Sequence, residues 1–262
     1  MNSNFSIRPS ARKQYKMKMA LQGPSGSGKT YSALQLAFGL CNDWSKICVI
    51  DTENGSADLY SHLGPYNVLS LTAPFEPERY IAALKTCQDA GMEVIILDSI
   101  SHEWEGIGGI LDIHGNMPGN SFANWAKVTP RHNSFVQAIL QSSAHIIATI
   151  RTKQDYVLSE KNGKMVPEKV GLKGVTRDGM DYEFTLVFDL DMSHRAVASK
   201  DRTGEFSSIH PKPLGKEVGW TILQWCKHEN TVVNGQNIVA SAATNVQTLK
   251  SNYPNHFPNG RH

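Results

Sequence analysis

Along most of the chain, the apolar positions follow one of two patterns. Short apolar runs bounded by polar residues are typical of strands, most of them buried on both faces. Apolar residues at helical spacing separate these runs. The predicted strands are residues 16–22, 46–51, 66–71, 93–98 and 145–150. The predicted helices are residues 31–40, 76–91 and 125–143. Strands that alternate with helices indicate an α/β fold, with a mainly parallel twisted sheet flanked by helices.

The pattern changes after residue 150. Residues 151–181 are polar without clear periodicity, and residues 106–120 contain five glycines, so both segments are predicted to be irregular loops. Residues 183–191 and 194–201 are predicted to form a β-hairpin, followed by a closing helix over 217–229. Residues 230–262 are rich in Asn, Ser, Thr, Pro and Gly, as is typical of a flexible tail. We therefore expect one domain over 1–229 and a tail over 230–262.

Composition narrows the class of protein only a little. The chain of 262 residues has a net charge of +2 and a hydrophobic content of 40%, which is typical of a globular domain and does not by itself indicate a nucleic-acid-binding protein. No apolar run approaches the roughly 18 residues needed to span a bilayer, so no membrane association is expected. The four cysteines form no CxxC pair, and a reducing cytoplasm is the expected location.

The segment GPSGSGKT, residues 23–30, matches the phosphate-binding pattern G-x-x-x-x-G-K-[ST] in full. It lies between a predicted strand and a predicted helix, which is the context that the pattern requires. Lys29 is expected to reach the β- and γ-phosphates of ATP, and the Thr30 hydroxyl to ligate Mg²⁺. The residues expected to surround the phosphates are Gly23, Pro24, Ser25, Gly26, Ser27 and Gly28.

A second ligand for Mg²⁺ is expected from an acidic residue at the end of a neighbouring strand. Asp98 ends the apolar run 93–98 and has this position. The alternative is a solvated carboxylate at a strand end. Hydrolysis also needs a group that activates water, and the residue after Asp98 is Ser99, so Glu103 and Glu105 are the nearest but weaker candidates.

A better candidate follows the second strand, in CVIDTENGSADLY, residues 48–60. This stretch resembles the RecA recombinase family, in which an Asp-x-Glu triplet closes that strand. The resemblance implies a RecA-like P-loop NTPase in which Glu53 activates water and Tyr60 stacks on adenine. The alternatives are a surface carboxylate for Glu53 and ordinary packing for Tyr60.

The resemblance extends from about Lys16 to Arg202 and also includes a group of AAA-domain ATPases common in phage and prophage genomes. The stretches that carry it are IDTENGSADLY, RYIAAL, IILDSISHEWEG, DYEFTLVFDLD and ASKDR. Some members of that group are linked to single-strand annealing and recombination. The resemblance therefore implies a role on single-stranded DNA in phage recombination or replication, in the cytoplasm of a bacterial host.

Lys200 and Arg202 lie two positions apart on a predicted strand, so their side chains are expected to share a face. In RecA-like ATPases a late Lys-x-Lys or Lys-x-Arg pair reaches the γ-phosphate bound by a neighbouring subunit. The resemblance implies the same role here, and with it a homo-oligomer, either a ring or a filament. The alternative is a solvated strand end in which the cations pair with Asp201 or Glu205.

The same resemblance implies that two loops bind DNA, here residues 105–122 and 151–181. The second loop carries Tyr156, which could stack on a base, and a small excess of cations. These cations are Arg151, Lys153, Lys161, Lys164, Lys169, Lys173 and Arg177. The alternative is a solvated loop or a contact with another protein. The RecA family has a glutamine before this loop, whereas this chain offers Thr149 and Arg151 as groups that could sense the γ-phosphate.

The leading hypothesis is therefore a Mg²⁺-dependent ATPase that acts on single-stranded DNA. A second hypothesis is a nucleotide-dependent assembly switch that recruits a protein partner without binding DNA. A third is a P-loop kinase, but a kinase needs no group to activate water, and Glu53 argues against it.

Overall fold

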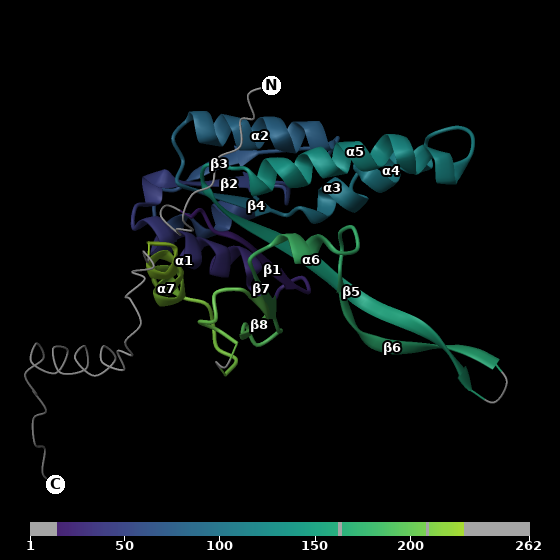
Figure 1. The fold of residues 1–262 in the computed structure, drawn as a ribbon. Helices are drawn as coiled ribbons and strands as arrows, with labels where there is room; N and C mark the ends of the chain where they lie inside the picture. The colour runs from purple at the N-terminus through teal and green to yellow at the C-terminus, as the bar shows by residue number, and fades with distance from the viewer. Residues whose placement is uncertain (1–14, 162–163, 208–209, 228–262) are drawn as a thin grey trace, which may run out of the picture. The chain divides into compact units, whose positions relative to one another are not determined.

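The computed structural model describes residues 15–161, 164–207 and 210–227, with no description of the side chains of 156–170 (Figure 1). Seven strands lie side by side in one sheet. Each neighbouring pair is parallel, except the pair at one edge, which is antiparallel. In spatial order they are β3 (Asn67–Ser70), β2 (Ile47–Asp51), β4 (Val94–Asp98), β5 (His145–Lys161), β1 (Lys18–Gly23), β7 (Leu186–Leu190) and β8 (Ala196–Asp201). The mainly parallel sheet predicted from the apolar runs is confirmed.

Helices cover both faces of this sheet, and the alternation of side chains along β1 shows why. Met19 and Leu21 contribute to the apolar core under one layer, whereas Ala20 contributes to the core under the other. The first layer contains α1 (Lys29–Cys41) and α7 (Lys216–Lys227), and the second contains α2 (Pro77–Asp89) and α5 (Ser121–Leu140). The predicted α/β class, with a C-terminal hairpin and helix, is therefore confirmed.

Among the described residues, five short helical elements lie in the connections between the strands and the longer helices. They are η1 (Trp44–Lys46), η2 (Ser56–Leu63), α3 (Ser101–Glu105), α4 (Ile110–Gly115) and α6 (Met180–Glu183). The prediction that 106–120 is an irregular loop is wrong over α4. The predicted strand 183–191 is also too long, because it starts only at Leu186.

The prediction of an irregular loop over 151–181 is wrong for most of its length. Strand β5 pairs with β1 as far as Arg151 and then continues beyond the sheet, where it pairs with the antiparallel strand β6 (Lys164–Gly174). We call this two-stranded extension, residues 152–161 and 164–174, the arm (Figure 1). Backbone hydrogen bonds join the two strands, and the sequence of this segment shows no clear hydrophobic period. The dipeptide Asn162-Gly163 in the sequence is a hairpin signal that the polar composition concealed.

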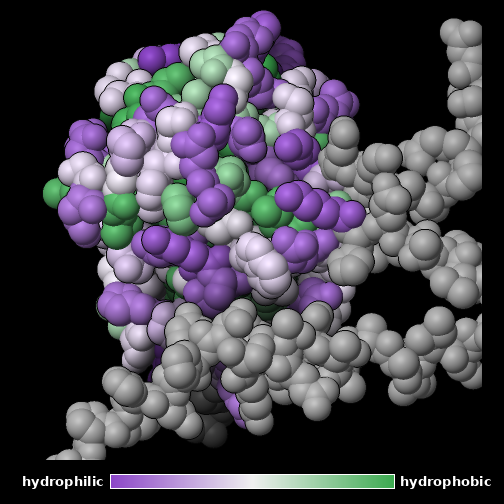
Figure 2. Space-filling model, turned by 90° about the vertical axis from the view of Figure 1, so that its left-hand side faces the viewer, coloured by the Kyte–Doolittle hydropathy of each residue, from purple (hydrophilic) through white to green (hydrophobic). Residues whose placement is uncertain are grey.

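No helix among the residues described is long and apolar enough to cross a membrane. Figure 2 shows the side of the body that lies at left in Figure 1, where polar and apolar residues are interspersed. The tail predicted over 230–262 lies outside the described residues.

Helices α1 and α7 cross where two glycines face each other. A Cβ atom on Gly39 would lie 2.8 Å from the Cα of Gly219 and would collide with the carbonyl oxygen of Lys216. A Cβ on Gly219 would lie 2.9 Å from the Cα of Gly39. The close approach of the two backbones therefore requires glycine at both positions.

Gly39→Ala is expected to lower the free energy of unfolding by about 1–3 kcal/mol, because the added methyl group overpacks this crossing. Urea denaturation of the purified variant measures the change. Gly115→Ala is the matched control, since its Cβ would meet nothing within 4 Å. Equal unfolding midpoints for the two variants would contradict the close approach of α1 and α7.

Candidate functional site

The glycine-rich segment forms the turn between β1 and α1. Gly26 and Gly28 have φ angles of +83° and +84°, which side chains other than glycine rarely adopt. The Lys29 ammonium folds back over the turn and donates to the carbonyl oxygens of Gly23 and Pro24, at 2.9 Å each. Burial lowers the pKa of Lys29, while the charges of Asp98 and Glu53 partly oppose this effect.

The turn fits a polyphosphate. Ser27 is fully buried, and its hydroxyl has no hydrogen-bond partner among the described residues. A Cβ atom on Gly28 would lie 3.0 Å from the His194 ring, so a residue with a side chain at position 28 would crowd this ring. Within the part of the chain that the structure describes, the hydrogen-bond partners of Lys29 are carbonyl oxygens, which an anionic ligand can replace. These features agree with the expected phosphate site over Gly23–Thr30.

Thr30 and Asp98 lie together, as the metal-site prediction requires. The Thr30 hydroxyl donates to one carboxylate oxygen of Asp98 at 2.6 Å, and the Thr149 hydroxyl donates to the other at 2.5 Å. Burial raises the pKa of Asp98, and the two hydroxyl hydrogen bonds act in the opposite direction. A carboxylate beside a hydroxyl is a suitable ligand pair for Mg²⁺. Thr149 therefore orients Asp98 in this structure.

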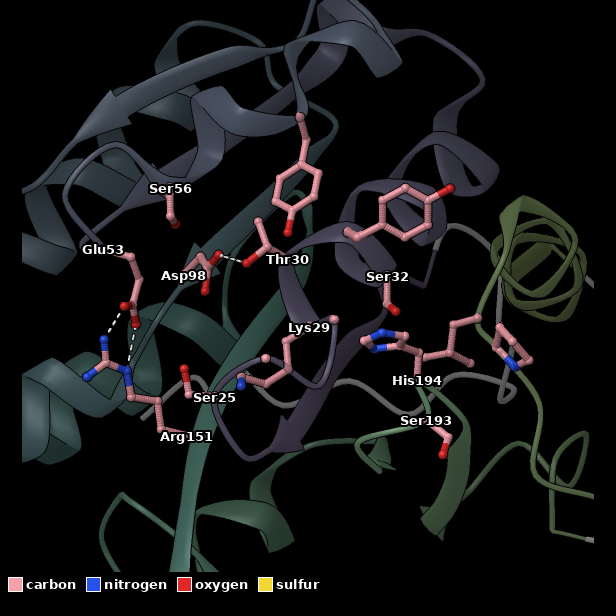
Figure 3. Close-up of a pocket in the computed structure, with 16 residues that line it drawn as sticks. Ser25, Lys29, Thr30, Ser32, Glu53, Ser56, Asp98, Arg151, Ser193 and His194 are labelled. Carbon is pink, nitrogen blue, oxygen red and sulfur yellow. Dashed lines mark hydrogen bonds and ion pairs between the residues drawn. The ribbon is translucent and has the colours of Figure 1, made fainter.

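Glu53 lies beside this pair because of the strand register. Asp51 at the end of β2 is level with Asp98 at the end of β4, so the turn after β2 lies next to the metal ligands. The Glu53 carboxylate accepts from the Ser99 hydroxyl at 3.0 Å and from Arg151 Nε at 2.8 Å. A second Arg151 nitrogen contacts the other carboxylate oxygen (Figure 3). Burial acts to raise the pKa of Glu53, but the hydrogen bonds and charge of Arg151 outweigh it and lower the pKa.

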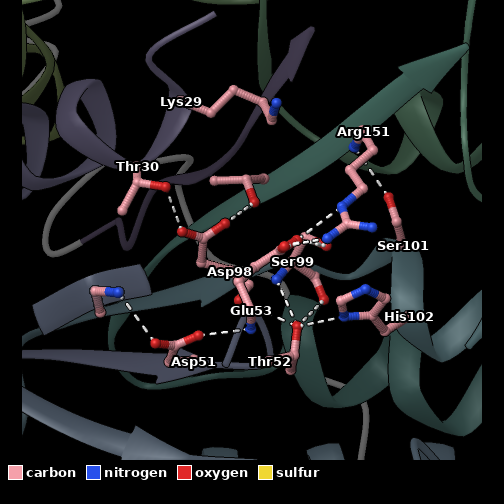
Figure 4. A network of polar contacts seen from close by, with 12 residues as sticks. Lys29, Thr30, Asp51, Thr52, Glu53, Asp98, Ser99, Ser101, His102 and Arg151 are labelled. Atoms are coloured by element: carbon pink, nitrogen blue, oxygen red, sulfur yellow. Dashed lines mark hydrogen bonds and ion pairs between the residues drawn. The ribbon is translucent and has the colours of Figure 1, made fainter. Parts of the chain in front are cut away.

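Two neighbouring residues fix the position of the turn. The carboxylate of Asp51 accepts from the backbone N–H groups of Glu53 at 2.6 Å and Ala57 at 3.0 Å. The Thr52 hydroxyl donates to the Asp98 carbonyl oxygen at 3.1 Å and accepts from the Ser99 N–H at 2.8 Å. It also forms a hydrogen bond of 2.8 Å with His102 Nδ1 (Figure 4). Sequence reasoning missed both roles, although the Asp-Thr-Glu triplet contained the signal: Asp followed two positions later by a turn residue is typical of a side chain that caps its own turn.

Asp51→Ala is expected to lower the free energy of unfolding by about 1–3 kcal/mol, because it leaves two inward N–H groups without their acceptor. The same change frees the turn that holds Glu53, so ATP turnover should fall more than ATP affinity. Urea denaturation and steady-state kinetics measure the two effects. The account of Asp51 is wrong if stability and turnover both stay at the level of the unaltered protein.

The two alternative glutamates lie away from this group. Glu103 is buried, and its carboxylate contacts His132 Nδ1 at 3.0 Å. Glu105 is exposed and pairs with Lys153 at 3.3 Å. Neither residue lines the cavity at the glycine-rich turn.

That cavity has a volume of about 700 Å³, and it brings together most of the predicted site residues. Gly26, Lys29, Thr30, Glu53 and Asp98 line it, together with Tyr60. The Tyr60 ring lies 6.0 Å from the Tyr31 ring in an edge-on arrangement. The adenine-stacking role of Tyr60 stays a prediction. The Tyr60 side chain lines the same cavity as the phosphate turn.

Sequence reasoning missed several lining residues because they depend on the sheet topology. Strand β7 lies beside β1, so the turn between β7 and β8 lies over the glycine-rich turn and supplies Ser193 and His194. Pro213 and Leu214 come from the segment before α7. These positions carry no motif in the sequence, and only the strand order could have indicated them.

Lys200 and Arg202 do not line the cavity of their own chain. The Lys200 ammonium donates to the carbonyl oxygens of Asp181 at 3.2 Å and Tyr182 at 2.5 Å. Arg202 follows the end of β8, and among the described residues its guanidinium has no ion pair. Among the described residues Asp201 forms no ion pair with either cation, and its carboxylate accepts hydrogen bonds from residues 203–207, including the Phe206 N–H at 2.8 Å.

The predicted DNA-binding segments form the arm and the α3–α5 region beside it. The side chain of Tyr156, with those of Lys161, Lys164 and Lys169, lies outside the described side chains. Lys153 and Lys173 lie at the base of the arm, each in an ion pair, with Glu105 and Asp178 respectively.

A phosphate-binding turn after a central strand and a buried aspartate at the end of another, in a mainly parallel sheet with helices on both faces, define a P-loop NTPase. Residues 15–216 match the family model described as AAA domain, and the chain belongs to this family of P-loop ATPases. Members of the family generally use a nucleotide and Mg²⁺. A comparison with curated proteins gave no match.

Proposed function

We propose that this protein is a Mg²⁺-dependent ATPase of the RecA-like type that acts on single-stranded DNA. The observation that carries the proposal is the convergence of Lys29, Thr30, Asp98 and Glu53 on one cavity. Phosphate-binding, metal-binding and base functions then lie within one nucleotide site.

In this mechanism the glycine-rich turn and Lys29 hold the triphosphate, and Lys29 exchanges its two carbonyl partners for phosphate oxygens. Thr30 and Asp98 would hold Mg²⁺, which neutralises charge on the phosphates when bound. Glu53 then accepts a proton from the attacking water. Arg151 lowers the pKa of Glu53 against the effect of burial, so the carboxylate becomes a stronger proton acceptor when Arg151 moves away from it.

Arg151 controls whether Glu53 is available. In this structure the guanidinium contacts both carboxylate oxygens of Glu53, so Arg151 competes with water for this carboxylate. Arg151 lines the same cavity, where the γ-phosphate is the competing anion. We therefore assign Arg151 as the group that senses the γ-phosphate.

Hydrolysis is completed at subunit interfaces in this proposal. Lys200 and Arg202 do not line the cavity of their own chain, so a role in hydrolysis would place them at the nucleotide of a neighbour. The support is that, among the described residues, neither cation forms an ion pair, and that the Asp201 carboxylate accepts hydrogen bonds from its own loop. The expected assembly is a ring or filament of this chain.

The DNA role rests on the predicted cations of residues 151–181 and on the resemblance in sequence, which also points to phage recombination or replication in a bacterial cytoplasm. ATP turnover measured with and without single-stranded DNA, alongside the mass of the assembly, tests it. We expect Mg²⁺-dependent turnover by an oligomer that binds the strand. ATP-dependent assembly without DNA binding would instead support the assembly switch.

A further inference from the structure

The turn between β7 and β8 runs alongside the phosphate turn. Strand β7 pairs with β1 in parallel, so the residues that follow the two strands lie next to each other. A Cβ atom on Gly23 would lie 2.7 Å from the carbonyl oxygen of Leu190, and a Cβ atom on Gly28 would lie 3.0 Å from His194 Nδ1. The β7–β8 turn therefore forms one wall of the nucleotide cavity, to which it supplies Ser193 and His194.

His194 has a backbone conformation that residues with a side chain seldom adopt. Its φ angle is +60°, in the left-handed region that favours glycine. Glycine would fit this turn without strain, so the shape of the turn does not explain a histidine. The side chain is exposed, so packing in the core does not explain it either. A strained residue on the wall of a ligand cavity indicates a functional role.

Asp191 holds the turn in this conformation. One oxygen of its carboxylate accepts from the Ser193 N–H at 2.8 Å and from the Arg195 N–H at 2.9 Å. Its carbonyl oxygen accepts from the His194 N–H at 3.0 Å, and its own N–H donates to the Arg195 carbonyl oxygen at 2.9 Å. All three N–H groups of residues 193–195 are thus bonded to Asp191. The position of His194 is therefore set before a ligand binds, as a binding residue requires.

The imidazole ring of His194 is available to a ligand in the cavity. In Figure 3 it points from the β7–β8 turn toward the start of α1, where Lys29 and Ser32 lie. Among the residues that the structure describes, neither ring nitrogen has a hydrogen-bond or ion-pair partner. The ring can therefore offer an N–H donor to the molecule that occupies the cavity.

The strand order indicates which part of a nucleotide lies beside this ring. Glu53 follows β2 and Arg151 lies on β5, whereas His194 follows β7, and β1 with its phosphate turn lies between the two groups. Figure 3 shows Glu53 and Arg151 on the other side of Lys29 from His194. A nucleotide whose γ-phosphate faces Glu53 and Arg151 therefore has its α-phosphate on the side of the β7–β8 turn.

We propose that His194 binds the α-phosphate of the nucleotide through an N–H of its ring. An anionic phosphate oxygen is a strong acceptor for such a donor. This inference rests on the nucleotide-binding part of the proposed function. It adds a residue to that site which lies outside the phosphate-binding motif, 164 positions beyond Thr30 in the sequence.

The test is competition binding of ADP and of inorganic tripolyphosphate against a fluorescent ADP analogue, using the full chain with Mg²⁺. His194→Gly is expected to raise the Kd for ADP roughly 10- to 100-fold, as for the loss of one hydrogen bond to a charged group. The Kd for tripolyphosphate should also rise, because the contact is with phosphate. The urea midpoint should stay close to that of the unaltered chain, since glycine adopts the conformation of this turn without strain.

Two further variants assign the loss to the ring. His194→Asn also tolerates the left-handed conformation, but its side chain is too short to take the place of the imidazole, so it should lose affinity for ADP as well. Arg195→Ala is the matched control, because it removes a positive charge from the same turn but outside the cavity. Its Kd for ADP should equal that of the unaltered chain.

An unchanged Kd for ADP in the two His194 variants, or an equal loss in Arg195→Ala, would overturn the role of His194 while leaving the nucleotide site intact. Tripolyphosphate that fails to compete, or competes equally for the unaltered chain and for His194→Gly, would overturn the contact with phosphate. Failure of the unaltered chain to bind ADP would overturn the nucleotide part of the proposed function, and the contact with it.

Discussion

Glu53→Gln is expected to lower ATP turnover by about 10²- to 10⁴-fold while ATP still binds. Glutamine keeps the size of the side chain but cannot accept a proton from water. The phosphate turn, Lys29 and the Thr30–Asp98 pair are unchanged in this variant, so the affinity for ATP should stay close to that of the unaltered chain. Steady-state phosphate release and equilibrium binding of a fluorescent ATP analogue separate the two quantities.

Glu105→Gln is the matched control for this variant. It removes another carboxylate near the end of the same sheet, but one that pairs with Lys153 and lies outside the nucleotide cavity. Its turnover in the absence of DNA should be normal. Equal turnover in the Glu53→Gln and Glu105→Gln proteins would contradict the assignment of Glu53 as the base.

The double change Lys200→Ala and Arg202→Ala is expected to lower turnover by about 10³- to 10⁵-fold, the range measured when a cation is withdrawn from a phosphoryl-transfer site. ATP binding should persist, because neither side chain reaches the cavity of its own chain. Phosphate release from the assembled oligomer measures the loss. Lys212→Ala serves as the control for a nearby exposed cation outside the cavity.

Mixing distinguishes action between subunits from action within one. A Glu53→Gln subunit supplies intact cations to its neighbour, and a subunit that lacks the two cations supplies an intact Glu53. The two inactive proteins should therefore regain part of the activity when they assemble together. A mixture that remains as inactive as its components, although it forms mixed oligomers, would contradict catalysis across an interface.

Much of the nucleotide site could be predicted from sequence because its residues belong to short motifs at strand ends. The phosphate turn needs only its glycines, Lys29 and Thr30 in order, and Asp98 needs only the apolar run before it. The prediction for Glu53 came from the triplet that begins at Asp51. In the structure Lys29, Thr30, Glu53 and Asp98 line one cavity, although no single motif indicates that they meet.

The contacts that sequence could not supply depend on strand order. Arg151 meets Glu53 across 98 positions because β4 alone separates β2 from β5 in the sheet. His194 reaches the nucleotide cavity because β7 pairs with β1. Nothing local in either segment fixes these neighbours.

The arm was missed for a different reason. Beyond Arg151 the strand leaves the main sheet and pairs only with β6, and its sequence shows no period of two. Polar composition then resembles that of a loop.

The most direct test of the account is a structure of the chain with Mg²⁺ and a non-hydrolysable ATP analogue. The account predicts the triphosphate in the Gly23–Thr30 turn, Mg²⁺ on Thr30 and Asp98, and Arg151 withdrawn from Glu53 toward the γ-phosphate. The Glu53 carboxylate should then hold a water in line with that phosphate. A bound nucleotide with Glu53 still paired to Arg151 and no water between carboxylate and phosphate would contradict the assignment of the base.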